Sequence, residues 1–201
     1  MVSQLGITMA CILMGHSLAG FSTPYYANKY PSEVSAVIGI DPTVPAGDAA
    51  MCDSTCAAGT PAADYSWAHI PSTLGLIRWA SALCYREPGG DSFTEAERRQ
   101  MQQMTGWNFS SQAAPDETLR MGENAAKLKD LRYPDSLPDL DFLSQDTMSD
   151  QAEWWGAHEC QPANVKRHEL VVLDGAHYLH WTRSKAMAQK IREFPSGGDA
   201  Q

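Results

Sequence analysis

The sequence predicts an α/β protein with a mostly parallel sheet, flanking helices and a helical insertion. Residues 7–14, 34–40 and 168–173 form short apolar runs with the length of buried strands. Stretches long enough to form helices separate these runs, as the crossovers between parallel strands require. The 201 residues also suffice for a sizeable hydrophobic core.

Composition excludes several classes of function. The net charge is −9 and the basic residues are scattered, so nothing indicates binding to nucleic acid or to an anionic membrane surface. Residues 1–4 carry no positive side chain, no signal-peptidase site follows them, and the run 7–14 is too short to span a bilayer. We therefore interpret that run as a core strand.

The cysteines indicate a redox compartment. Their number is five, which is odd, and their spacing does not repeat, so we expect reduced thiols and a cytoplasmic location. Cys52 and Cys56 could pair if the chain were exported. No second close pair accompanies them, so we expect no metal site.

The first run ends in the turn GHSLAG, residues 15–20, which places Ser17 among small residues. A serine at a crowded strand-to-helix turn is typical of a nucleophile elbow, which lifts the hydroxyl clear of the backbone. The helix that follows directs its free N–H groups at the same point, where they can stabilise negative charge. The backbone N–H of Leu18 is the expected oxyanion donor.

The elbow resembles that of the α/β-hydrolase superfamily, whose lipase- and esterase-like members often carry GHSxGG. The resemblance continues through residues 26–45 (YANKYPSEVSAVIGIDPTVP) and resumes at residues 168–194. Ala19 stands where the family usually has glycine, and Pro24 predicts a kink in the helix. The resemblance covers both ends of the chain but not the middle.

The resemblance implies the C-terminal part of an α/β-hydrolase fold. Family members place the nucleophile after the fifth strand, about a hundred residues into the domain, whereas Ser17 stands near the start of this sequence. We therefore expect a fragment, a truncated product or a chain completed by a partner. The first strand would then expose one edge, which favours self-association.

Between the core strands the sequence predicts a helical cap or lid, residues 45–136, of the kind that many α/β hydrolases insert. A loop rich in Ala, Gly and Asp is followed by apolar residues at helical spacing over residues 70–84. The capping box TEAE at residues 94–97 opens one helix, and another follows residue 115. The nucleophile-elbow half of the core is then residues 1–44.

The C-terminal part of the core is expected over residues 137–195. A third strand, 137–144, is weakly predicted, because Asp139 and Asp141 alternate with apolar residues and suggest an exposed polar face. A helix over 149–164 precedes the strand 168–173, and a last helix packs an apolar face on the sheet. Residues 196–201 are predicted to be a disordered tail.

The resemblance places the general base at His177, in a Gly-x-His sequence just after a buried strand. A serine hydroxyl is a poor nucleophile until a base removes its proton, and imidazole titrates near neutral pH. We expect His180, three residues on, to contact the substrate or to support the residues that do. His16, beside the nucleophile, is a candidate for a substrate contact, but adjacent side chains at an elbow point apart, so packing is its favoured role.

Two aspartates compete for the acid that orients the imidazole. Asp146 follows the third expected strand, the commonest location in the family, and gives the chain order Ser, Asp, His. Asp41 ends the second strand, a location that some members use. The sequence favours Asp146 and leaves Asp41 as the alternative.

The resemblance implies a serine hydrolase that cleaves a small carboxylic ester or amide through an acyl-enzyme, without metal or organic cofactor. One alternative is a peptidase of the proline-iminopeptidase type, which shares this layout. The other is a non-catalytic remnant that binds an apolar ligand or a partner chain.

Overall fold

The computed structural model describes residues 6–44, 74–76, 79–80, 93–108, 113–150, 154–162 and 164–194. The chain divides into two compact units, residues 1–58 with 125–201, and residues 59–124. The expected cap boundaries at 45 and 136 stay a prediction. The expected tail, residues 196–201, and most of residues 45–92 lie outside the described part.

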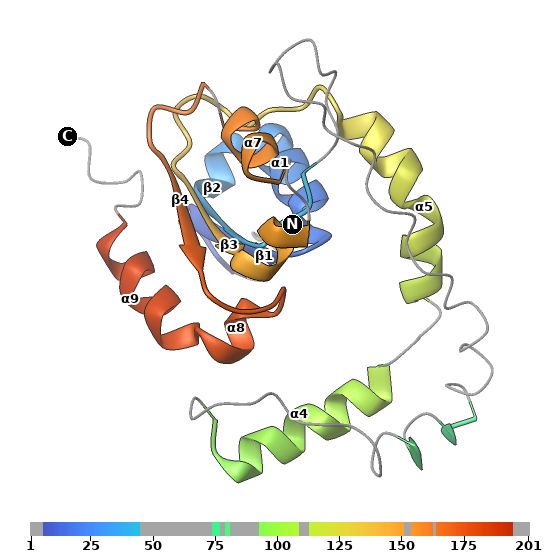
Figure 1. The fold of residues 1–201 in the computed structure, drawn as a ribbon. Helices are drawn as coiled ribbons and strands as arrows, with labels where there is room; N and C mark the ends of the chain where they lie inside the picture. The colour runs from blue at the N-terminus through green and yellow to red at the C-terminus, as the bar shows by residue number, and fades with distance from the viewer. Residues whose placement is uncertain are drawn as a thin grey trace. The chain divides into compact units, whose positions relative to one another are not determined.

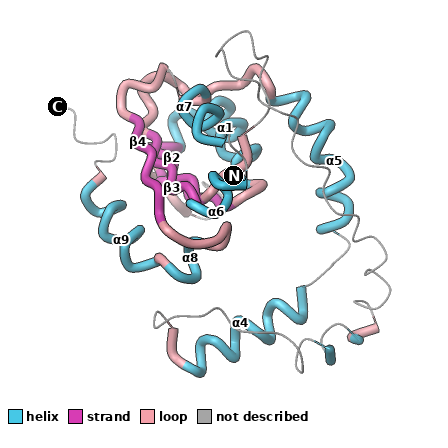
Figure 2. Tube along the Cα trace, viewed as in Figure 1, coloured by secondary structure: helices cyan, strands magenta, loops and turns pink. Residues whose placement is uncertain are grey.

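The first unit contains a four-stranded sheet in the order β1-β2-β3-β4, with every neighbouring pair parallel. The strands are β1 Cys11–His16, β2 Val34–Ile40, β3 Asp139–Ser144 and β4 His168–Leu173. Figure 2 shows β2, β3 and β4 side by side, with helices and loops around them. The predicted α/β class with a mostly parallel sheet is confirmed, although β1 begins four residues later than expected.

Two apolar clusters cover the sheet on opposite faces. One contains Ala27, Val37 and Tyr133, and so joins the sheet to helix α1, Ala19–Lys29. The other contains Ile38 and Phe142 together with side chains of the C-terminal helices. Since β2 contributes to both clusters, it is buried on both faces, as its continuous β-branched run predicts.

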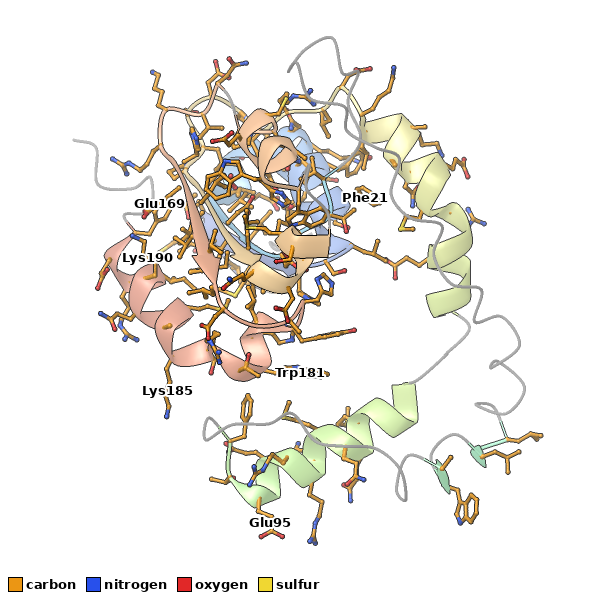
Figure 3. The ribbon with its side chains drawn as sticks, in the orientation of Figure 1. Phe21, Glu95, Glu169, Trp181, Lys185 and Lys190 are labelled. Carbon is orange, nitrogen blue, oxygen red and sulfur yellow. The ribbon has the colours of Figure 1, made fainter. Side chains whose placement is uncertain are left out.

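Helices of the first unit follow β1, β3 and β4 along the chain (Figure 1). They are α1, the short 3-10 turn η2 Pro31–Glu33, α6 Gln145–Asp150, α7 Trp154–Cys160, α8 Leu179–Thr182 and α9 Ser184–Glu193. The single helix expected over 149–164 is thus replaced by α6 and α7. Helix α1 continues through Pro24. An ion pair between Lys190 and Glu169 ties α9 to β4 (Figure 3).

The second unit contains α4, Glu95–Asn108, and most of α5, Ala113–Leu128. The predicted capping box opens α4. The Thr94 N–H donates to the Glu97 carboxylate at 2.7 Å, and the Glu97 N–H donates to Thr94 Oγ1 at 3.3 Å. Two N–H groups at the helix start are satisfied reciprocally in this way.

Strand β3 corrects a prediction. Asp139 and Asp141 are 0% and 2% exposed, so the polar face expected on this strand is buried. A Cβ at Gly39 of β2 would lie 1.9 Å from an Asp141 carboxylate oxygen. Burial raises the pKa of both carboxyls, because it disfavours the charged form.

Strand β1 has β2 as its single partner within the described residues, so it lies at one end of the sheet. Ile12 and Met14 on this strand are 45% and 53% exposed. The expected exposed apolar edge is therefore present in the described part of the chain.

Cys160 is disulfide-bonded, whereas Cys11 is a free thiol. The expectation of reduced thiols is therefore wrong for Cys160. The cytoplasmic location stays a prediction. None of the helices in the described residues is long and apolar enough to cross a membrane.

Candidate active site

Ser17 lies at a sharp turn between β1 and α1, as the elbow pattern predicts. Its φ of 54° is in the left-handed region, which is strained for a residue with a side chain. Three backbone hydrogen bonds hold it there. The Ser17 N–H donates to the Ile40 carbonyl at 3.2 Å, and the Ser17 carbonyl accepts from the N–H groups of Gly20 at 2.9 Å and Thr43 at 2.8 Å.

Small residues are required on both sides of this turn. A Cβ at Gly15 would lie 2.6 Å from the Cβ of Ala19, and a Cβ at Gly20 would lie 2.2 Å from the Thr43 carbonyl oxygen. The structure thus accommodates alanine at position 19 by keeping glycine at position 15. Leu18 is the N-cap of α1, so its backbone N–H belongs to the helix end whose N–H groups have no partner within the helix.

His177 lies between β4 and α8 and contacts Asp41 at the end of β2. Its Nδ1 is 2.6 Å from Asp41 Oδ2. Since a carboxylate accepts, we assign the proton to Nδ1, which leaves Nε2 with a free lone pair. The His177 side chain is 35% exposed and the Asp41 side chain 0%. The Nδ1 edge of the imidazole is therefore held by a buried group, while the rest of the ring remains accessible.

Four donors converge on the Asp41 carboxylate. Oδ1 accepts from the Ser144 N–H at 3.1 Å and from Trp154 Nε1 at 3.0 Å, and Oδ2 accepts from Thr147 Oγ1 and His177 Nδ1, both at 2.6 Å. Burial raises the pKa of Asp41, but these hydrogen bonds together hold it below its usual value. Asp41 therefore stays ionised although it is buried.

The structure brings His177 to Asp41 and not to Asp146. Asp146 lies in the first turn of α6 with an exposed side chain. Its backbone N–H donates to the Gly175 carbonyl at 3.3 Å. Asp146 thus helps to hold the loop before His177 through its main chain, whereas its carboxylate points to the surface.

His16 lies beside His177, and His180 lies beside His16. The His16 ring centroid is 4.5 Å from that of His177 and 4.7 Å from that of His180. His16 Nε2 is 3.0 Å from the His177 carbonyl oxygen, so this nitrogen is engaged by the main chain. Burial lowers the pKa of His16 to about 4 and also lowers that of His180. The substrate contacts suggested for both stay a prediction.

Sequence reasoning missed the groups that hold Asp41. Thr147, Trp154 and the Ser144 N–H follow no motif. Thr147 and Trp154 reach Asp41 because α6 and α7 fold back over the end of β2, and Ser144 reaches it from the end of the neighbouring strand β3. His158 is also buried, and its Nε2 lies 2.9 Å from the Pro42 carbonyl oxygen and its Nδ1 2.8 Å from that of Trp154. His158 thereby links the turn after Asp41 to α7.

No group of His, Cys, Asp and Glu side chains suited to hold a metal occurs in the described residues. The site as built has a serine on a strained turn, an imidazole with a free nitrogen and a buried ionised carboxylate. These groups follow β1, β4 and β2, at the edge of a parallel sheet where the carboxyl ends of the strands meet. They are suited to activating a hydroxyl as a nucleophile.

Solved structures show that the chain has the α/β-hydrolase fold. Cfl2 from Burkholderia cenocepacia matches with a TM-score of 0.62 at 16% identity, over 96% of this chain and 67% of Cfl2. A laboratory-evolved potato epoxide hydrolase gives 0.61 at 13% identity, over 96% and 73%. A carboxylesterase structure from Nitrososphaera gargenis gives 0.53 at 15% identity, over 96% and 66%.

Among curated proteins, the uncharacterized protein YbdG of Bacillus subtilis is 28% identical over 142 residues. The match covers 70% of this chain and 42% of YbdG, so the chain spans less than half of that relative. No family model matches the chain.

Proposed function

We propose that the chain carries the catalytic residues of a serine hydrolase that cleaves a carboxylic ester or amide. Ser17 is the nucleophile, His177 the general base and Asp41 the acid that orients the base. The observation that carries the proposal is the hydrogen bond of 2.6 Å between His177 Nδ1 and the buried Asp41 carboxylate. This hydrogen bond leaves Nε2 free to act as the base, at the carboxyl ends of the strands, where Ser17 also lies.

The choice of Asp41 over Asp146 rests on that contact and on the donors around it. An orienting acid has to be ionised and fixed, and Asp41 is both, because its oxygens accept from Ser144, Thr147 and Trp154 as well. The sequence favoured Asp146, whose side chain is exposed. In this proposal Asp146 has no role in the chemistry.

In the first half-reaction His177 Nε2 takes the hydroxyl proton while Ser17 Oγ forms a bond to the substrate carbonyl carbon. The carbonyl oxygen becomes an oxyanion, for which the Leu18 N–H is one donor. The C–O or C–N bond then breaks, and the leaving group takes the proton from His177. Asp41 stabilises the imidazolium meanwhile. Water, deprotonated by His177, releases the acid in the second half-reaction.

The test is covalent labelling of Ser17 by a fluorophosphonate, together with hydrolysis of p-nitrophenyl acetate. We expect labelling at Ser17, and nearly complete loss of turnover in Ser17→Ala and in His177→Ala. The double variant should lose no more than either single one, because the residues act as a unit. Turnover that persists in Ser17→Ala would contradict the assignment.

Labelling and substrate preference together separate the two alternatives from the proposal. A non-catalytic remnant would leave Ser17 unlabelled while binding an apolar ligand or a partner chain. A peptidase of the proline-iminopeptidase type would label, but would prefer a substrate with a free N-terminal proline to a simple ester. A preference for the simple ester supports the proposal.

A further inference from the structure

His16 connects the turn that carries Ser17 to the loop that carries His177. It is the last residue of β1, directly before Ser17, and its Nε2 lies 3.0 Å from the backbone carbonyl oxygen of His177, 161 positions along the chain. Its ring also lies against the ring of His177, with centroids 4.5 Å apart. The residue before the nucleophile therefore touches both the main chain and the side chain of the base.

The loop that carries His177 is partly exposed, so hydrogen bonds from neighbouring elements help to fix it. Gly175 has a φ of 125°, the His177 side chain is 35% exposed and the next residue, Tyr178, is 48% exposed. The loop is thus partly exposed up to Tyr178, before Leu179 enters the core, and hydrogen bonds to its carbonyls add to that anchor. Ser144 Oγ donates to the Gly175 carbonyl at 2.7 Å, and His16 Nε2 is within hydrogen-bonding distance of the His177 carbonyl.

The protonation state of His16 agrees with this role. A carbonyl oxygen only accepts, so the proton of the neutral ring lies on Nε2. Burial lowers the pKa of His16 to about 4, which keeps the ring uncharged near neutral pH. A neutral neighbour is required, because His177 becomes an imidazolium during the reaction and a second charged ring against it would repel that cation.

We propose that His16 is a positioning residue, which sets His177 against Ser17 by donating its Nε2–H to the His177 carbonyl. The role rests on the proposed function, because positioning has a catalytic meaning only if His177 is the base. It replaces the substrate contact that the sequence suggested for His16. His16 then acts on the geometry of the base and not on substrate affinity.

The test compares His16→Leu, which removes the donor, with His16→Gln, whose amide N–H can reach the same carbonyl. With p-nitrophenyl acetate, we expect kcat to fall on the order of a hundredfold in His16→Leu, because misplacing a catalytic group by about 1 Å has that effect, with KM little changed. His16→Gln should recover most of the loss. His168→Leu is the matched control, since His168 is exposed and its Nδ1 likewise lies 3.3 Å from a backbone carbonyl oxygen, that of Val165.

Backbone amide exchange over residues 175–180 gives a readout that does not need activity. Exchange should accelerate at least tenfold in His16→Leu and remain near the wild-type rate in His16→Gln. If the wild type fails to label with fluorophosphonate, the proposed function is wrong, but amide exchange still tests whether His16 holds the His177 loop. Unchanged exchange in His16→Leu would overturn the inference, and so would a rise in KM with kcat unchanged, which indicates a substrate contact.

Discussion

Replacing Asp41 by asparagine should abolish turnover, and the donors around the carboxylate show how. Oδ1 faces the Ser144 N–H and Trp154 Nε1, while Oδ2 faces Thr147 Oγ1 and His177 Nδ1. An asparagine offers one oxygen and one NH2 group. Its NH2 cannot take the place of Oδ1, because it would meet two N–H groups that cannot accept. The NH2 therefore takes the place of Oδ2.

In that position the amide N–H points at His177 Nδ1, which has to give up its proton in order to accept. The imidazole proton then sits on Nε2, the nitrogen that should receive the proton of Ser17. A wrong tautomer of this kind lowers kcat about ten-thousandfold in a well-characterised serine protease, or about 5 kcal/mol in activation free energy. Stability should fall by only about 1–3 kcal/mol, because most of the hydrogen bonds persist.

The assay is hydrolysis of p-nitrophenyl acetate, with thermal unfolding followed by circular dichroism to establish that the variant is folded. Asp146→Asn is the matched control, because the Asp146 side chain is exposed on α6. Its rate should stay within a few-fold of the wild type. A folded Asp41→Asn that turns over at nearly the wild-type rate would refute this reasoning, most clearly if Asp146→Asn were inactive.

Two further predictions concern stability and association. Burial raises the pKa of Asp139 well above 3.8, so the stability of the wild type should fall as pH rises from about 4 toward the pKa in the folded state. Asp139→Asn should flatten this dependence of stability on pH, measured by urea unfolding at several pH values. An equal dependence in the wild type and the variant would contradict the prediction. We also propose that the chain self-associates through the exposed edge of β1. A charge on this edge opposes pairing, so Met14→Lys should lower the mass measured by light scattering. Tyr25→Lys, at a similarly exposed residue of α1, should leave the mass unchanged. A monomeric wild type would contradict the proposed self-association.

Local patterns sufficed where local physics decides the structure. The strands were predicted because an apolar run of about six residues buries both faces of a parallel strand, as β2 does. The elbow was predicted because a turn this tight admits only small neighbours, and a Cβ at Gly15 or Gly20 would indeed collide with the chain. Neither inference needs a residue distant in sequence.

Long-range contacts account for what the sequence could not reveal. Alternation in β3 predicted an exposed face, but Asp139 pairs with Val37, which belongs to the cluster with Tyr133, and Asp139 is buried. Both carboxylate oxygens of Asp139 lack a hydrogen-bond partner, so its burial opposes stability, and no propensity anticipates that. Two donors to Asp41, Thr147 and Trp154, likewise come from helices more than 100 positions away along the chain.

The register of the sheet explains why Asp41 lies at the level of Ser17. His16 pairs with Ile40, so Ser17 and Asp41 leave neighbouring strands at the same level. Both adopt positive φ, 54° and 44°, and they are the only non-glycine residues that do so in the described part of the chain. Strain at both positions is consistent with a site that fixes these two residues. Ile40 pairs with Phe142, so β3 runs two residues further, to Ser144, and Asp146 comes later still. It is carried into α6 and away from the level of Ser17, so the sheet aligns Asp41, and not Asp146, with Ser17.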